Sequence, residues 1–146
     1  MKALALGLLA LITVIGSQSS YAQGIAGNYY TPFTQIPNSD EFRPESLRMI
    51  NEDGSYEVRT IHNGAQEIYV GTYQVDGSRV TFKKGTYKAI CPNVLNSDEG
   101  EFTANFRRTP NELMLSQDSE TFSFPVATQA EIQKILSLPV CGSGTN

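Results

Sequence analysis

The feature that most restricts the fold of this sequence is a series of turn signals that recur every few residues along most of the chain. These clusters contain Gly, Asn, Asp or Pro and occur at residues 51–54, 63–64, 76–77, 84–85, 109–111 and 117–119. The segments between them are short and rich in β-branched and aromatic residues, which is typical of strands. The pattern therefore predicts a succession of β-hairpins.

Several of these segments alternate between apolar and polar residues. In the segment 55–61, Tyr56 and Val58 fall on one face, whereas Glu57 and Arg59 fall on the other. A period of two with one polar face is typical of an antiparallel sheet that meets solvent on one side. The strands that we expect are 28–36, 47–51, 55–61, 66–75, 78–83, 86–91, 101–108, 113–116 and 121–126.

This series of short strands favours an all-β fold. Eight or nine strands joined by tight turns predict a small antiparallel up-and-down barrel of about eight strands, because closure removes exposed strand edges. An open β-sandwich is the alternative. Two longer loops are expected, over residues 37–46 and 92–100.

One helix is expected near the carboxyl end. Thr128 and Glu131 have the spacing of a capping box, in which each side chain binds a backbone amide at the start of a helix. Apolar residues at positions 132, 135 and 136 form one stripe at helical spacing. We therefore predict a helix over 129–137, ended by Pro139.

The first 22 residues are typical of a secretory signal peptide. Lys2 precedes an apolar run from Leu4 to Ile15, and small residues, Ser20 and Ala22, precede the expected cleavage point. The run is shorter than the roughly 20 residues that cross a bilayer. We expect cleavage after Ala22, leaving one secreted or periplasmic domain over 23–146 with no membrane span. A retained N-terminal anchor is the alternative.

The two cysteines of the chain, Cys91 and Cys141, both lie in the expected mature part. An exported protein meets oxidising conditions, so we predict a disulfide between them that holds the helix against the barrel. Free or metal-binding thiols are the alternative, but no CxxC pair or histidine cluster accompanies them. We expect neither a metal site nor another cofactor.

Charge and motif content restrict the function. The chain has 11 Lys and Arg against 15 Asp and Glu, a net charge of −4, which argues against a nucleic-acid partner. His62 is the only histidine and lies beside the Asn63-Gly64 turn. A histidine base needs a nucleophile and an orienting carboxylate, and the chain contains no GxSxG motif or phosphate-binding glycine loop. We therefore expect a binding protein and not an enzyme.

Several short motifs resemble the lipocalin-like, or calycin, family of small barrels. They are Gly27-Asn28-Tyr29, residues 53–56, residues 71–77 and residues 80–82. The chain departs from the family at one position, because Tyr29 stands where the family usually has tryptophan, and the sequence contains no tryptophan. The resemblance implies a small apolar or amphipathic molecule bound inside a barrel.

Alternation also predicts which side chains point inward. The inward set that we expect is Tyr29, Val58, Val80, Phe82, Phe102, Phe106, Leu113, Leu115, Phe122 and Phe124. Tyr69 and Tyr73 share one face of their strand and are further candidates to line a ligand cavity. We expect an uncharged, mostly apolar ligand, with tyrosine hydroxyls as its polar contacts. The alternative for these residues is a filled core.

A second functional class is compatible with the same fold. A filled barrel that presents a rigid loop would act as a protein-interaction or inhibitor module on an exported protein partner. The loops 37–46 and 92–100 are the candidates for this role.

Overall fold

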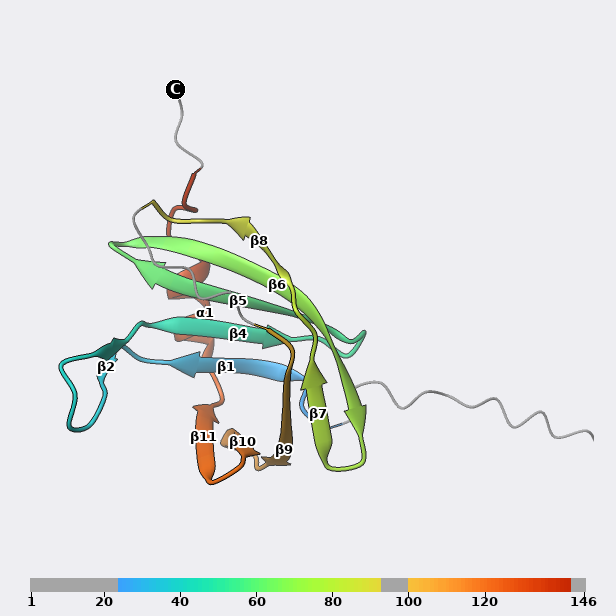
Figure 1. Cartoon of the computed structure of the whole chain (residues 1–146). Coiled ribbons are helices and arrows are strands. Elements are labelled where there is room, and N and C mark those ends of the chain that lie inside the picture. Colours follow the sequence, from blue (N-terminus) through green and yellow to red (C-terminus); the bar gives the residue numbers. More distant parts are fainter. Residues whose placement is uncertain (1–23, 93–99, 143–146) are drawn as a thin grey trace, which may run out of the picture.

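A computed structural model describes residues 24–92 and 100–142 (Figure 1). This part of the chain contains strands and one short helix. The elements are β1 (Gly27–Thr31), β2 (Thr34–Gln35), β3 (Phe42–Arg43), β4 (Ser46–Ile50), β5 (Ser55–His62), β6 (Ala65–Asp76), β7 (Arg79–Phe82), β8 (Thr86–Ala89), β9 (Phe102–Arg108), β10 (Glu112–Gln117), β11 (Glu120–Pro125) and α1 (Gln129–Leu136).

The main sheet is antiparallel and nearly closes into a barrel. Its strand order is β1-β4-β5-β6-β7-β9-β10-β11, so it follows the order of the chain. The two ends meet through a bridge between Tyr29 and Val126 and a 2.8 Å hydrogen bond from the Ala127 amide to the Asn28 carbonyl. The expected fold class, an all-β antiparallel barrel with one helix near the carboxyl end, is confirmed.

The longest strand, β6, joins the two halves of this sheet. One edge of β6 pairs with β5 from Ala65 to Thr72. Its other edge pairs with β7 near one end and with β8 near the other. Because β7 and β8 follow each other along the same edge, the chain between them must pass very close to the β6 backbone, at Gly85.

The segment before β4 differs from the sequence prediction. The strand expected over 28–36 is divided, because β1 ends at Thr31 and Pro32 has no amide hydrogen for the sheet. A separate hairpin follows, in which β2, at the end of the expected strand, pairs with β3, which lies within the loop expected over 37–46. This hairpin projects from the barrel beside β1 and β4 (Figure 1).

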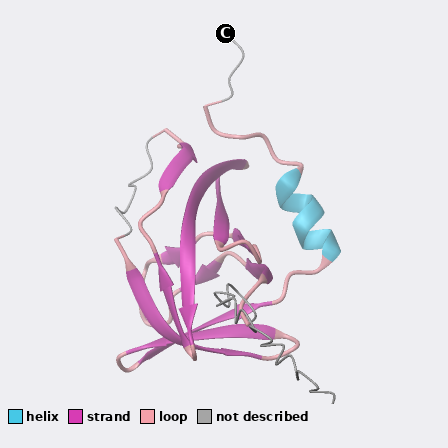
Figure 2. Cartoon of the chain, turned by 90° about the vertical axis from the view of Figure 1, so that its right-hand side faces the viewer, coloured by secondary structure: helices cyan, strands magenta, loops and turns pink. Residues whose placement is uncertain are grey.

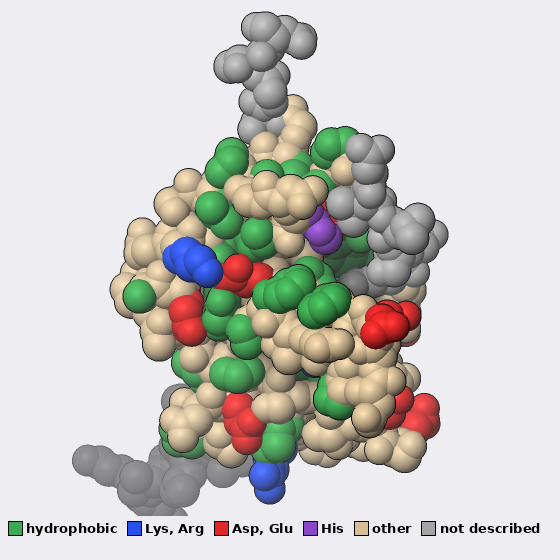
Figure 3. All heavy atoms as spheres, turned by 90° about the vertical axis from the view of Figure 1, so that its left-hand side faces the viewer, with side chains coloured by type: hydrophobic (Ala, Val, Ile, Leu, Met, Phe, Trp, Pro, Cys, Tyr) green, Lys and Arg blue, Asp and Glu red, His purple; other side chains and the backbone are tan. Residues whose placement is uncertain are grey.

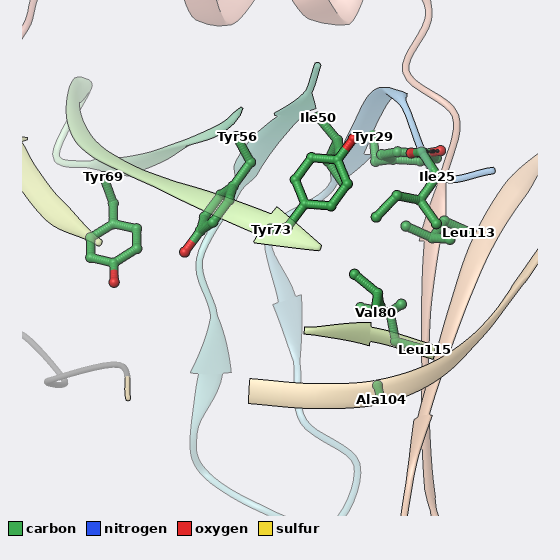
Figure 4. Packing of buried hydrophobic residues seen from close by; sticks show 10 residues of the cluster. All are labelled: Ile25, Tyr29, Ile50, Tyr56, Tyr69, Tyr73, Val80, Ala104, Leu113 and Leu115. Carbon is green, nitrogen blue, oxygen red and sulfur yellow. Dashed lines mark hydrogen bonds between the residues drawn. The ribbon is translucent and has the colours of Figure 1, made fainter. Parts of the chain in front are cut away.

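The closed part of the interior is a core of tyrosines and aliphatic residues. Its buried members are Ile25, Tyr29, Ile50, Tyr56, Tyr69, Tyr73, Val80, Ala104, Leu113 and Leu115. In Figure 4 the side chains of Ile25, Leu113, Val80 and Leu115 lie close together, while Tyr69 lies at the opposite end of the group. Several aliphatic members of the core therefore gather at one end of the group, away from Tyr69.

The helix lies on the outside of the sheet (Figure 2). It begins with the expected capping box, since Thr128 and Glu131 bind each other's backbone amides, and Ser137 is its C-cap. Ile135 is fully buried, and the helix contacts β1 and β4. Leu136, expected in the same apolar stripe, is the last residue of the helix and is 40% exposed.

A carboxylate on the barrel also ties down the helix. Glu45 accepts hydrogen bonds from Lys134 Nζ at 2.6 Å and from the Tyr30 hydroxyl at 2.7 Å. Burial alone would raise the pKa of Glu45, but these bonds from Lys134 and Tyr30 hold it below its ordinary value of 4.5. Burial and the bond to Glu45 raise the pKa of Tyr30 to about 12.

This contact predicts a pH-dependent contribution to stability. A lowered carboxyl pKa stabilises the fold above the unfolded value, and the stabilisation disappears as the pH falls through the folded value. We expect Glu45→Gln to lower the free energy of unfolding by about 1 kcal/mol at pH 7, because the contact is partly solvated. Urea unfolding of both proteins at pH 7 and pH 3 measures this difference, which should shrink at pH 3. An equal difference at both values would contradict the assignment.

The predicted disulfide between Cys91 and Cys141 is present, with a Cα–Cα distance of 4.9 Å. It lies beside a parallel bridge between Gln66 and Val140. Gln66 is almost completely buried, and its side-chain amide nitrogen, Nε2, donates to the Leu138 carbonyl at 2.6 Å. The segment after the helix is therefore held by the disulfide and by hydrogen bonds to the first part of β6.

Candidate functional site

A pocket of about 480 Å³ opens into the barrel beside the tyrosine core. One wall comes from β4 and β5, and the other comes from β7, β9, β10 and β11. The lining residues are Arg48, Ile50, Tyr56, Val58, Phe82, Gly100, Glu101, Phe102, Leu113, Leu115, Phe122 and Phe124. Most of them are aliphatic or aromatic, so the pocket is suited to an apolar molecule.

The strand register explains why these side chains meet. Cross-strand partners point to the same face of a sheet, so each inward residue brings its neighbour with it. The lining pairs are Arg48 with Val58, Ile50 with Tyr56, Phe82 with Phe102, Leu113 with Phe124, and Leu115 with Phe122. The pocket is thus built from paired positions on rigid strands.

The residues expected to line a cavity fall into two groups. Seven of them line the pocket: Val58, Phe82, Phe102, Leu113, Leu115, Phe122 and Phe124. The other five do not line it and belong to the packed core or lie against it: Tyr29, Tyr69, Tyr73, Val80 and Phe106. The interior therefore combines the two alternatives that the sequence left open, a filled core and a cavity.

The hydroxyls of the core tyrosines bind backbone groups. Tyr29 donates to the Ile25 carbonyl at 2.7 Å, and Tyr73 donates to the Asn51 carbonyl at 2.6 Å. Burial, with the nearby Asp53 carboxylate as a smaller cause, raises the pKa of Tyr73 to about 12. These hydroxyls fix the core, and the polar contacts expected from them in a ligand site must come from other residues.

An inward-facing arginine supplies such a contact. Arg48 is the middle residue of β4 and lies opposite Tyr29 on one side and Val58 on the other. Its Nη1 donates to Thr31 Oγ1 at 3.2 Å and to Ser46 Oγ at 3.0 Å. Its guanidinium carbon lies 4.5 Å from the centre of the Phe124 ring. The contacts therefore orient the guanidinium at the pocket wall.

Sequence reasoning did not identify Arg48 as a site residue. A signal for it was present, because Arg48 lies two residues before Ile50 and therefore shares a face of the strand with it. Pairing of this strand with the next one would have placed Arg48 beside Val58, which was expected to point inward. An arginine in a predicted strand is ordinarily assigned to the solvent face, and here the two hydroxyl contacts and the Phe124 ring hold it on the inner face.

The second charged residue of the lining is Glu101, at the start of the described segment before β9. Its side chain is 56% exposed and accepts a 2.8 Å bond from Lys83 Nζ, which is itself 41% exposed. Glu101 therefore belongs to the solvated rim of the pocket, where the lysine offsets its charge.

His62 does not lie in this pocket. It ends β5, before the Asn63-Gly64 turn, whose two residues have φ values of 51° and 78° as a tight hairpin turn requires. Its Nε2 lies 3.8 Å from the Glu67 carboxylate. Among residues 24–92 and 100–142, no group of three or more His, Cys, Asp and Glu side chains could hold a metal ion.

Comparisons with known proteins supply no family. The chain matches no protein-family model, and no curated protein matches it. A solved structure of an uncharacterized protein from Bacteroides eggerthii is similar, with a TM-score of 0.49 and 13% sequence identity over 70% of this chain and 98% of that chain. The helix of the described part is too short and too polar to cross a membrane.

Proposed function

We propose that this chain is an exported, lipocalin-like binding protein that holds a small, mostly apolar or amphipathic ligand in the barrel pocket. The observation that carries the proposal is the pocket itself, about 480 Å³ in volume and walled mainly by paired aliphatic and aromatic side chains. Ligand pockets commonly measure roughly 300–1,000 Å³ and combine apolar walls with a few polar groups.

Two observations support export. The first 22 residues have the pattern of a signal peptide, and the described part contains a disulfide. Disulfides persist mainly in oxidising compartments such as the periplasm and the extracellular space. A secreted or periplasmic protein that carries a small molecule is consistent with both.

The test fills the pocket with a larger ring. Phe102 lines the pocket and contacts Phe82, with ring centroids 6.4 Å apart. We expect the parent protein to bind phenylnaphthylamine, an uncharged apolar fluorophore, in a saturable way. Phe102→Trp should weaken this binding about tenfold, because the indole takes up pocket volume. Fluorescence titration of both proteins measures the effect.

The matched control places the same substitution outside the barrel. Phe33 is 63% exposed beside the β2–β3 hairpin, so Phe33→Trp should leave the affinity of the pocket unchanged. Failure of the parent protein to bind saturably would refute the proposal. Equal weakening by both variants would show that the fluorophore binds elsewhere.

One observation favours a second candidate function, a protein-interaction module. Phe33 and Phe42, which is 52% exposed, stack on the projecting hairpin with ring centroids 5.1 Å apart. Figure 3 looks onto the side of the molecule from which this hairpin projects, and apolar side chains gather at the middle of that face. If the pocket binds nothing, this hairpin becomes the leading candidate for an exported partner.

A further inference from the structure

We propose that the pocket is selective for planar aromatic ligands and binds them more tightly than aliphatic molecules of similar size. This inference rests on the proposed function, because it names the chemical class of ligand for the same pocket. It is carried by the kind of side-chain surface that the walls leave open and by the way in which these side chains are held.

The surface that a ligand would touch consists mainly of aromatic rings. Of the described residues that line the pocket, five are aromatic and four are aliphatic. Three of the aliphatic residues are buried, with exposed fractions of 6%, 1% and 6%: Ile50, Leu113 and Leu115. By contrast, the lining phenylalanines are only half-buried: Phe82, Phe102, Phe122 and Phe124. Their rings therefore present most of the apolar surface that stays accessible in the pocket.

The ring of Phe82 is held in a fixed orientation by the tyrosine core. It packs edge-to-face against Tyr56, with ring centroids 5.2 Å apart and planes at 89°, and lies 5.9 Å from the Tyr73 ring. Both tyrosines are anchored in turn, because their hydroxyls donate to the carbonyls of Lys83 and Asn51. This wall is therefore preorganised and does not reshape itself around a ligand.

The phenylalanine rings belong to two parts of the wall. Phe82 and Phe102 are cross-strand neighbours on β7 and β9, with ring centroids 6.4 Å apart and planes at 29°. Phe122 and Phe124 lie on β11, which β10 separates from β9 in the sheet. A flat ring in the pocket can therefore contact phenylalanines of both groups, with its edge or with its face.

These walls reward a rigid ring more than a flexible chain. Edge-to-face and offset contacts between rings stabilise a complex beyond the burial of apolar area, and an aliphatic ligand gains the burial alone. A chain must also lose rotational freedom to bind, which a fused ring does not. Methionine, whose flexible side chain adapts to ligands of many shapes, is absent from the described lining residues.

The experiment compares three uncharged alcohols. Decahydro-2-naphthol has the carbon skeleton and the hydroxyl of 2-naphthol but no aromatic ring, and 1-heptanol is a flexible chain that partitions between water and octanol much as 2-naphthol does. We expect the parent protein to bind 2-naphthol about fivefold more tightly than decahydro-2-naphthol and about tenfold more tightly than 1-heptanol. Isothermal titration calorimetry measures each dissociation constant.

Two variants remove one ring each and keep an apolar side chain. Phe102→Leu and Phe122→Leu change different parts of the wall, so the test does not depend on the folding of one variant. Each should weaken 2-naphthol binding about threefold and change decahydro-2-naphthol binding by less than about twofold. Phe33→Leu is the matched control, because it removes a 63% exposed ring outside the pocket, and it should leave both affinities unchanged.

The outcomes separate this inference from the proposed function. If the parent binds phenylnaphthylamine saturably but binds 2-naphthol no more tightly than decahydro-2-naphthol, aromatic selectivity is wrong and the pocket remains a ligand site. Equal weakening of both alcohols by Phe102→Leu and by Phe122→Leu would also overturn it, because the rings would then contribute apolar area only. No saturable binding of phenylnaphthylamine would refute the proposed function and this inference with it.

Discussion

Replacing both Cys91 and Cys141 with serine should lower the free energy of unfolding by about 4 kcal/mol. The disulfide closes a loop with a sequence separation of 50, and the loop-entropy model gives about this value for such a length. Removal of the disulfide should also weaken the neighbouring hydrogen bonds, because the backbone of Gln66 binds the backbone of Pro139 and of Cys141 in the segment after α1. Most single substitutions lower the free energy of unfolding by less than this.

Urea unfolding of the parent and of the double serine variant measures this difference. Parent protein kept in reductant is the internal comparison, and its free energy of unfolding should be close to that of the double serine variant. Thiol labelling of unfolded, unreduced parent protein should find no free cysteine, whereas two labels per chain would show that the bridge does not form. A variant as stable as the parent would mean that the hydrogen bonds to Gln66 hold this segment by themselves.

Gly85→Ala is expected to destabilise the fold by about 3 kcal/mol through a steric clash. A Cβ atom at Gly85 would lie 2.0 Å from the Val70 carbonyl oxygen, well inside contact distance. Val70 cannot move away easily, because it pairs with Glu57 of β5 and with Thr86 of β8. The Gly85 amide also donates to the Tyr69 hydroxyl at 2.6 Å, and displacement of the chain would break this bond.

Gly100→Ala is the control for this substitution. A Cβ at Gly100 meets no heavy atom within 4 Å, so the same change should leave the urea midpoint almost unaltered. Gly85→Ala should lower the midpoint and leave the disulfide intact. Equal midpoints for the two variants would show that the step from β7 to β8 tolerates a side chain, contrary to the close approach in the structure.

The strand pattern was readable from sequence because its causes are local. Turn residues such as Asn63 and Gly64 adopt left-handed backbone conformations that most residues avoid, so they mark the ends of strands directly. Alternation then assigned Val58, Phe82, Phe102, Phe122 and Phe124 to the inner face, where the structure places them. The capping box at Thr128 was readable for the same local reason.

The remaining features depend on contacts between distant segments. Alternation cannot tell whether an inward tyrosine faces a cavity or a packed core, and the carbonyl that the Tyr73 hydroxyl binds belongs to Asn51, 22 residues earlier in the chain. Arg48 was missed because its hydroxyl partner Thr31 lies on another strand and its ring partner Phe124 lies on another wall. The β2–β3 hairpin was missed because each of its strands has two residues, too few to show alternation.

The strand order of the barrel also bears on how the chain finds this fold. From β4 to β7 and from β9 to β11, each strand pairs with a neighbour that is close in sequence, so these hairpins form with little loss of loop entropy. The junction of β1 with β11, through Tyr29 and Val126, instead joins residues from nearly opposite ends of the described chain. Contacts of such long sequence separation form slowly. The barrel should therefore assemble as two hairpin sheets, β4 to β7 and β9 to β11, that join where β7 pairs with β9, with closure at β1 and β11 as the slow final step.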